Sequence, residues 1–139
     1  VAFWGEVADD HVAGLLQAVP DLGDTAVIIE STAVAMGDTF HRLWGNAESG
    51  NSEFIAIFTP WAWSDKYQDA KLPDGFELTE PEKTYAEQHK LTTEQMAWRR
   101  RKILQTGDTK FKSEFPINAI ECFQFAEAEL AFSVPGGAP

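Results

Sequence analysis

Hydrophobic positions recur with a helical period in several stretches of the chain. In residues 9–19 (DDHVAGLLQAV), apolar side chains stand three and four positions apart, at Val12, Leu15, Leu16 and Val19. This spacing places them on one face of a helix. The same pattern, together with capping residues and breakers, predicts further helices over residues 38–47, 80–89, 93–105, 109–115 and 118–132.

Two other stretches are apolar at nearly every position. They are residues 26–29 (AVII) and 53–59 (EFIAIFT). Short continuous apolar runs are typical of strands buried on both faces of a parallel sheet. Because a helix is predicted between them at 38–47, we expect a βαβ unit, with the strands parallel and side by side. The expected fold class is therefore α/β.

Polar side chains follow the first predicted strand directly. Glu30, Ser31 and Thr32 come after the apolar run, and a turn of small residues follows them. In open α/β sheets, ligands bind just beyond the carboxyl ends of the strands. Glu30 is thus a candidate acidic site residue. The alternative is that these side chains simply end the strand and cap the next segment.

The character of the sequence changes after Pro60. We expect residues 1–60 to form the α/β core, residues 61–117 a helical region, and residues 118–139 a helix with a linker stub, VPGGAP. The apolar start, VAFW at residues 1–4, has no initiating Met. Natural N-termini are more often polar, so we expect a segment of something longer.

Composition narrows the classes of function. A chain of 139 residues with 44% hydrophobic residues suits one folded domain. The net charge of −11 disfavours nonspecific binding of polyanions by the surface as a whole. One basic block, Arg99, Arg100, Arg101 and Lys102, could still contact DNA phosphates. On a helix these residues point in different directions, so a solvated helix face is the alternative.

Several kinds of site are not expected. The single cysteine, Cys122, excludes an internal disulfide, and without CxxC or a histidine cluster we expect no metal site. There is no phosphate loop, no GxGxxG and no HExxH. The Trp61-Ala62-Trp63 motif could stack on bases or pack between parts of the chain. No apolar run is long enough for a membrane helix, and we expect a cytoplasmic protein.

Six stretches resemble the large terminase subunit of tailed bacteriophages and prophages, in order and in spacing. They are VAFW, LLQAVP, VIIESTAVAMGDTFHRLW, FIAIFTPWAW, LTEPEKTYAEQHKLTTEQMAWRRRKI and FKSEFPINAIECF. The most specific are IIEST and WRRRKI followed by FKSEFP. That family is an ATP-driven motor for viral DNA packaging, with a P-loop ATPase domain and an RNase H-like nuclease domain. The resemblance implies a partial P-loop-NTPase-like parallel sheet with flanking helices, followed by a helical lid and linker region.

The resemblance carries only a few site residues with it. Ser31, Thr32 and Ala33 fall where the family has its coupling motif, whose hydroxyls sense the γ-phosphate of ATP. The phosphate-loop lysine, the Walker B acid and the nuclease carboxylates match nothing in this chain. The resemblance therefore implies a fragment that is inactive alone and binds no cofactor by itself, whereas the parent uses ATP and Mg²⁺. The parent's partners are double-stranded DNA, the small terminase subunit and the portal, in the bacterial host cytoplasm.

Two alternatives stay open beside this interpretation. Four apolar residues followed by Glu30 fit the loose Walker B pattern, so this carboxylate could itself be catalytic. The chain could also be a free-standing small binding module without catalysis. If the chain is instead the terminase-like fragment, the strands that flank residues 26–29 in the parent are missing, and we expect self-association, by edge pairing of the 26–29 strand or by exchange of residues 1–20.

Overall fold

The computed structural model describes residues 7–33 and 39–133, and for residues 127–133 only the helix itself. Its elements are α1 (Ala8–Ala18), α2 (Thr39–Glu48), the short 3-10 helix η2 (Trp61–Trp63), α3 (Glu80–His89), α4 (Thr93–Thr106), α5 (Asp108–Glu114) and α6 (Ala119–Ser133). The predicted helices are thus confirmed, with boundaries that differ by at most one residue.

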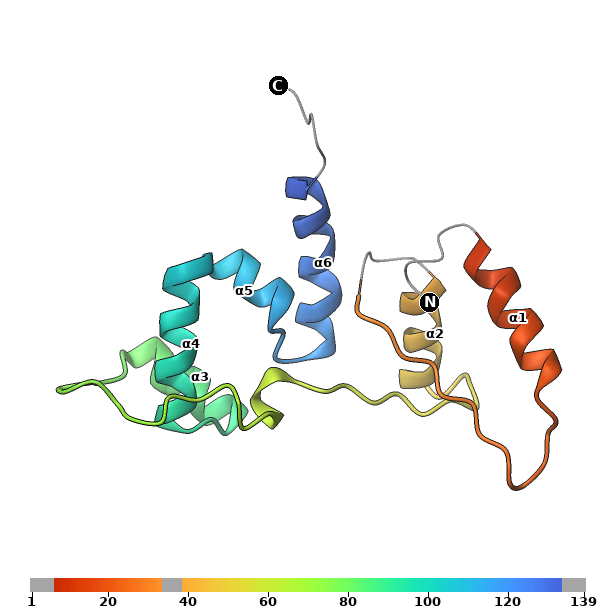
Figure 1. Cartoon of the computed structure of the whole chain (residues 1–139), viewed down its shortest axis with the longest axis horizontal. Coiled ribbons are helices and arrows are strands. Elements are labelled where there is room, and N and C mark those ends of the chain that lie inside the picture. Colours follow the sequence, from red (N-terminus) through yellow and green to blue (C-terminus); the bar gives the residue numbers. More distant parts are fainter. Residues whose placement is uncertain (1–6, 34–38, 134–139) are drawn as a thin grey trace.

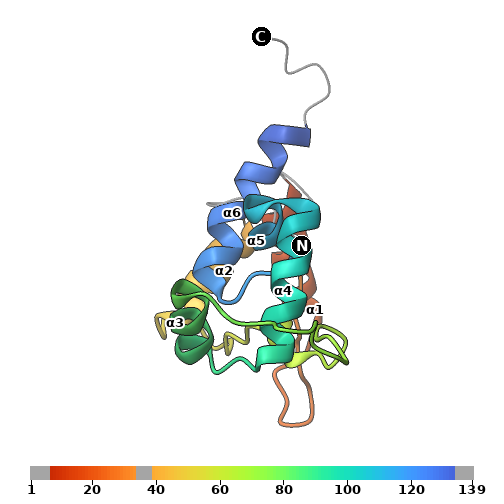
Figure 2. The same ribbon diagram turned by 90° about the vertical axis from the view of Figure 1, so that its left-hand side faces the viewer.

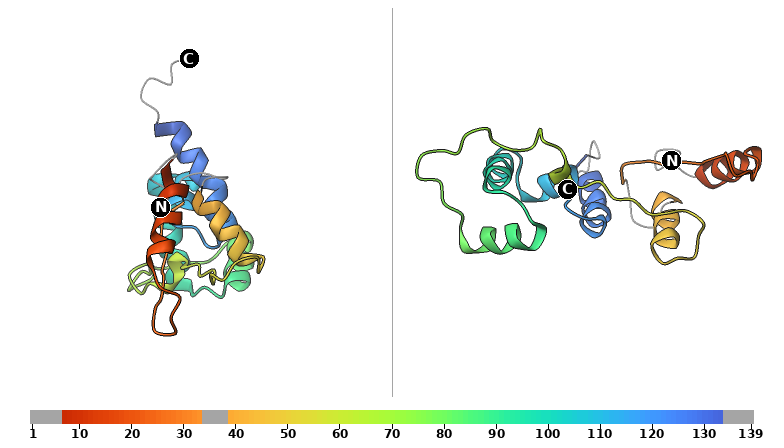
Figure 3. Two further views of the ribbon diagram at one scale, coloured as in Figure 1. Left: turned by 90° about the vertical axis from the view of Figure 1, so that its right-hand side faces the viewer. Right: turned by 90° about the horizontal axis from the view of Figure 1, so that it is seen from below.

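The helices form two groups with α6 between them. Figure 1 shows α1 and α2 at one end of the molecule and α3, α4 and α5 at the other. Figure 2 looks onto the second group, with the last turns of α6 projecting beyond it. In the right-hand view of Figure 3, an extended connection leaves α2 and leads to this group. In the described part of the chain, no helix is both long and apolar enough to cross a membrane.

Local sequence sets the starts of α3 and α4. Each is preceded by a threonine whose hydroxyl accepts from the backbone N–H three residues later, at Glu82 and Gln95 respectively. The side chains of Glu82 and Gln95 accept in return from the threonine N–H groups, at 2.8 and 2.9 Å. This reciprocal capping box satisfies donors that the first helical turn leaves free.

The main core lies among η2, α4 and α5. It is built from Trp61, Trp98, Phe111 and Ile117, all of them buried. The Trp61 and Trp98 rings stack with their centroids 5.2 Å apart, and Phe111 lies edge-on to Trp61 at 6.1 Å. Aromatic pairs in these geometries contribute about 0.5–1.5 kcal/mol beyond the area they bury.

A second cluster joins α2 to α6. Phe123 of α6 is buried, and its ring centroid lies 4.6 Å from His41 and 6.3 Å from Trp44. Trp44 in turn lies edge-on to Phe58, at 6.5 Å. Helix α1 is held to α2 by Asp9, which accepts from the Thr39 hydroxyl at 2.9 Å and pairs with Arg42.

The α/β prediction is wrong. The residues that the structure describes contain no strand and no sheet. Residues 26–30 and 55–59 are extended and the chain bends at residues 52–54, but the two apolar runs do not pair with each other as the βαβ unit requires. Ile28 is 86% exposed and Ile55 is 85% exposed, so neither segment is covered on both faces. An apolar run predicts extended backbone but does not show which elements will cover it, and here neither run has an element on both faces. Residues 1–4, 34–38 and 134–139 lie outside the described residues.

Candidate functional site

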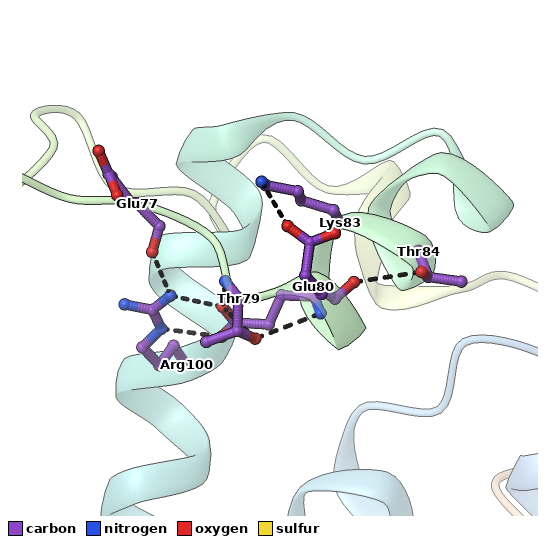
Figure 4. Close-up of polar contacts among 7 residues, drawn as sticks. Glu77, Thr79, Glu80, Lys83, Thr84 and Arg100 are labelled. Atoms are coloured by element: carbon purple, nitrogen blue, oxygen red, sulfur yellow. Dashed lines mark hydrogen bonds and ion pairs between the residues drawn. The ribbon is translucent and has the colours of Figure 1, made fainter.

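The arginines of the basic block lie on α4, and each makes contacts within the chain. Arg100 makes the most extensive set, because its Nε donates to Glu82 Oε1 at 2.8 Å and its Nη2 to Glu82 Oε2 at 2.5 Å. The same Nη2 donates to the Glu77 carbonyl at 2.7 Å. Figure 4 shows Arg100 reaching from α4 to the turn before α3. Its guanidinium also lies over the Phe76 ring, 4.3 Å from the centroid.

This fork has an electrostatic consequence for Glu82. Hydrogen bonds from Arg100 lower the pKa of the Glu82 carboxyl to about 2, with the Thr79 N–H adding to the effect and burial opposing it. A bidentate arginine–carboxylate pair is among the stronger polar contacts in proteins. Glu82 is therefore ionised at neutral pH, and it ties α3, α4 and their preceding loop together.

Arg101 and Arg99 are also engaged within the chain. Arg101 Nη2 donates to Asp69 Oδ1 at 2.5 Å, which fixes the loop after η2 to α4. Arg99 lies over two rings, with its guanidinium carbon 4.0 Å from the Tyr85 centroid and 5.6 Å from that of Phe111. Burial raises the pKa of the Tyr85 hydroxyl, and the nearby Arg99 charge partly offsets this. Cation–π contacts of this kind stabilise by about 0.5–2 kcal/mol.

The basic block is thus distributed around α4. Its three guanidinium groups hold α3, the 64–78 loop and α5 in place. Lys102 makes no ion pair with any carboxylate among the described residues. Since an arginine already paired with a carboxylate would have to exchange partners to contact a phosphate, the arrangement supports a structural role for Arg100 and Arg101.

The predicted coupling residues lie on an extended segment. Glu30 and Thr32 are exposed, whereas Ser31 and Ala33 are half-buried. The Ser31 hydroxyl donates to the Thr32 carbonyl at 2.8 Å. Burial raises the pKa of the Cys122 thiol, and a hydrogen bond from the Ala33 backbone partly offsets it. The structure therefore brings this segment against α6 and places it apart from the basic block.

An open groove of about 730 Å³ runs beside the second extended segment. It is lined by Trp44 and Ala47 of α2, by the residues that lead into α6, and by residues 52–56 with Phe58. Trp63, which is 68% exposed, also lines it. The side chains that line the groove are mainly apolar, as is usual in ligand-binding sites.

The remaining aromatic and histidine candidates mostly pack against other aromatic side chains. Trp61 is part of the core, so only Trp63 of the Trp61-Ala62-Trp63 motif offers an exposed ring. His89 lies 4.5 Å from the Tyr85 ring centroid, and desolvation followed by the Arg99 charge lowers its pKa. His41 packs on Phe123 as described above.

Three important residues escaped the sequence interpretation: Glu82, Asp69 and Phe111. The Thr79-x-x-Glu82 spacing is a readable capping signal, but nothing in the sequence pairs Glu82 with Arg100, which lies 18 positions away. Asp69 is 32 positions from Arg101. Side chains this far apart in sequence are brought together only by the tertiary structure.

Comparisons with known proteins identify no relative. No family model, no curated protein and no solved structure matches the chain. Among the residues described, no group of three histidine, cysteine, aspartate or glutamate side chains is arranged to hold a metal ion.

Proposed function

We propose that this chain is a non-catalytic segment of a DNA-packaging motor of the large terminase kind. The observation that carries the proposal is the resemblance of IIEST and of WRRRKI followed by FKSEFP, in the family's order and spacing. Residues 7–33 and 39–133 contain no sheet, which weakens the likeness to the ATPase core. The helical group after Pro60 is compatible with a lid and linker region.

In this proposal the chain transmits a signal and does not perform the phosphoryl transfer. Ser31 and Thr32 would sense the γ-phosphate of an ATP held by groups from elsewhere in the motor. The contact of Ala33 with Cys122 on α6 gives this segment a route to the helical group. Since α5 and α6 pack against each other, a shift at residues 31–33 would reach the core around Phe111.

The partners proposed follow from the motor. They are double-stranded DNA, the small terminase subunit and the portal, in the cytoplasm of a bacterial host. A direct phosphate contact would fall to Lys102 before the arginines, because Arg100 and Arg101 already pair with carboxylates.

The test is DNA packaging after induction of the prophage or phage that carries this coding sequence. Thr32→Ala should lower the DNase-protected DNA in particles at least tenfold, because it removes a sensing hydroxyl. Thr93→Ala is the matched control, since Thr93 is also an exposed threonine but opens α4 far from residues 31–33. Normal packaging by the Thr32 variant, or the absence of any packaged DNA in the unaltered host, would contradict the proposal.

A second candidate, the free-standing binding module, is favoured by the open groove beside residues 52–58. It needs no ATP and no packaging partner. A host in which Thr32→Ala packages normally while substitutions in the groove alter the phenotype would favour this candidate.

A further inference from the structure

Residues 55–59 are extended after a bend at residues 52–54, and the side chains of residues 54–58 have two distinct faces. Phe54, Ala56 and Phe58 are half-buried and face the rest of the chain, where Phe58 contacts Trp44. The alternate residues face solvent, with Ile55 85% and Ile57 73% exposed. Side chains that alternate in this way are typical of a strand, so the segment has the side-chain geometry of a strand without a neighbour.

The backbone of this segment is free to pair. Residues 55–59 make no backbone hydrogen bond to any other residue that the structure describes. Exposed strands of this kind are ready templates for another chain, because each unpaired N–H and C=O can bond to an extended backbone. Isoleucine and phenylalanine, which make up residues 54–58 apart from Ala56, also have high β-propensity.

The sequence of the segment reads the same in both directions. Residues 54–58 are Phe-Ile-Ala-Ile-Phe, with Ala56 at the centre. In an antiparallel pair of two copies centred on Ala56, Phe54 faces Phe58 of the second copy and Ile55 faces its Ile57. The two-fold axis that relates the two copies is perpendicular to the two-stranded sheet they form. The half-buried side chains of both copies therefore lie on the same face of that sheet. The smallest side chain then lies at the axis, and bulky apolar groups pair on either side.

We propose that residues 53–59 are a self-association surface, on which a second copy of this chain pairs as an antiparallel strand. The contact is isologous, so it closes as a dimer and does not propagate. Its charges are compatible with pairing, because Glu53 faces Thr59 and no like charges are opposite each other. The inference does not depend on the proposed function, since it uses only the geometry and sequence of this segment.

The net charge sets the conditions for pairing. Each copy carries −11, so two copies repel each other at low ionic strength. Salt screens this repulsion while leaving an apolar and backbone contact largely intact. We therefore expect the dimer to strengthen as salt is added, whereas a contact built on ion pairs would weaken.

The experiment measures mass by light scattering at about 1–100 µM, the range expected of a small interface. The unaltered chain should reach twice its monomer mass. The double variant Ile55→Lys, Ile57→Lys should remain monomeric, because each lysine would face a lysine of the second copy. Both isoleucines are exposed, so the helical content by circular dichroism should not change. The variant Ile55→Glu, Ile57→Glu should also be monomeric alone, and an equimolar mixture of the two should restore a dimer with one copy of each.

A matched control separates pairing from a general charge effect. The variant Ile28→Lys, Ile120→Lys adds the same two charges at isoleucines that are 86% and 77% exposed. It should dimerise like the unaltered chain. A monomeric unaltered chain, a dimer that survives the lysine pair at 55 and 57, a mixture that stays monomeric, or open-ended fibres that bind thioflavin T would each overturn the proposal.

Discussion

Arg100 and Glu82 illustrate how a residue's neighbours decide its role. As part of a basic block, Arg100 is a candidate for phosphate binding, yet its guanidinium is occupied by a carboxylate and a carbonyl. Arginine suits this position because its planar fork matches both carboxylate oxygens, which lysine cannot do. The pair is partly shielded, with the Glu82 side chain 15% exposed.

The first prediction concerns Glu82→Gln. At pH 7 the change should lower the free energy of unfolding by about 1–2 kcal/mol, since the charged fork with Arg100 is lost and the pair is only partly buried. The pKa of Glu82 is lowered to about 2 in the fold, against an ordinary value of 4.5. Its contribution is therefore complete above about pH 4.5 and is lost as the pH falls toward 2. Urea unfolding across this range measures both effects.

Glu80→Gln provides the control for that measurement. Glu80 is in the same first turn of α3 and pairs with Lys83 at 2.7 Å, but its side chain is 85% exposed. An exposed pair of this kind should contribute less than about 0.5 kcal/mol. Equal effects of the two substitutions, or an unchanged pH dependence in Glu82→Gln, would contradict the role given to Glu82.

At the residue scale, only part of this site could be predicted from sequence. The Thr79 and Thr92 caps can be predicted, because each threonine is followed three residues later by a glutamate or glutamine. The partners of Arg99, Arg100 and Arg101 do not, because they lie on other elements. Helical periodicity predicts that successive arginines point in different directions. It does not predict which carboxylate or aromatic ring lies next to each of them.

At the element scale, helices were easier to predict than strands. A helix makes its backbone hydrogen bonds within itself, so its period and its caps are local signals. A strand needs a partner, and the apolar runs at 26–30 and 53–59 carry no information about whether one is near. The sheet prediction is wrong because it assumed that the two apolar runs pair with each other.

The second prediction tests the local signal that sets α4. Thr92→Ala should lower the free energy of unfolding by about 1 kcal/mol, because the Gln95 N–H loses its hydroxyl partner. Thr93→Ala, one residue later, removes no cap and should change stability by only a few tenths of a kcal/mol. Thermal or urea unfolding distinguishes them, and an equal loss from both would show that the cap is not what stabilises the start of α4.

The third prediction tests the packing that holds α5 in place. Phe111 is 1% exposed and lies among Trp61, Trp98 and Phe115. Phe111→Ala should cost about 3–5 kcal/mol through lost burial and a residual cavity. Leu104→Ala, at a leucine that is 82% exposed, is the control and should be nearly neutral. A small effect at Phe111 would mean that this cluster is not the core.

At the scale of the whole molecule, the chain combines a packed helical group with two extended segments that are exposed to solvent on at least one face. The first part accounts for folding, and the second leaves backbone and apolar side chains available to a partner. Both the proposed motor role and the proposed dimer use the second part. They differ in the segment involved, residues 30–33 in one case and residues 53–59 in the other.

The fourth prediction follows from the chemistry that this chain lacks. The isolated chain should neither hydrolyse ATP nor cut DNA, because its sequence holds no phosphate loop and its described residues no metal-ligand cluster. Phosphate release above a protein-free blank is the measurement. Turnover that Glu30→Gln abolishes would contradict this and would revive Glu30 as a Walker B carboxylate.

The central claim is that residues 26–30 and 55–59 are extended but make no backbone pair with any other described residue of the same copy. Amide hydrogen exchange on the monomeric Ile55→Lys, Ile57→Lys variant tests it most directly. The amides of residues 55–59 and 26–30 should exchange at nearly the rate of unprotected backbone, while those in the middle of α4 exchange far more slowly. Strong protection of both extended segments in this monomer would show that they pair in a sheet, and would contradict the account.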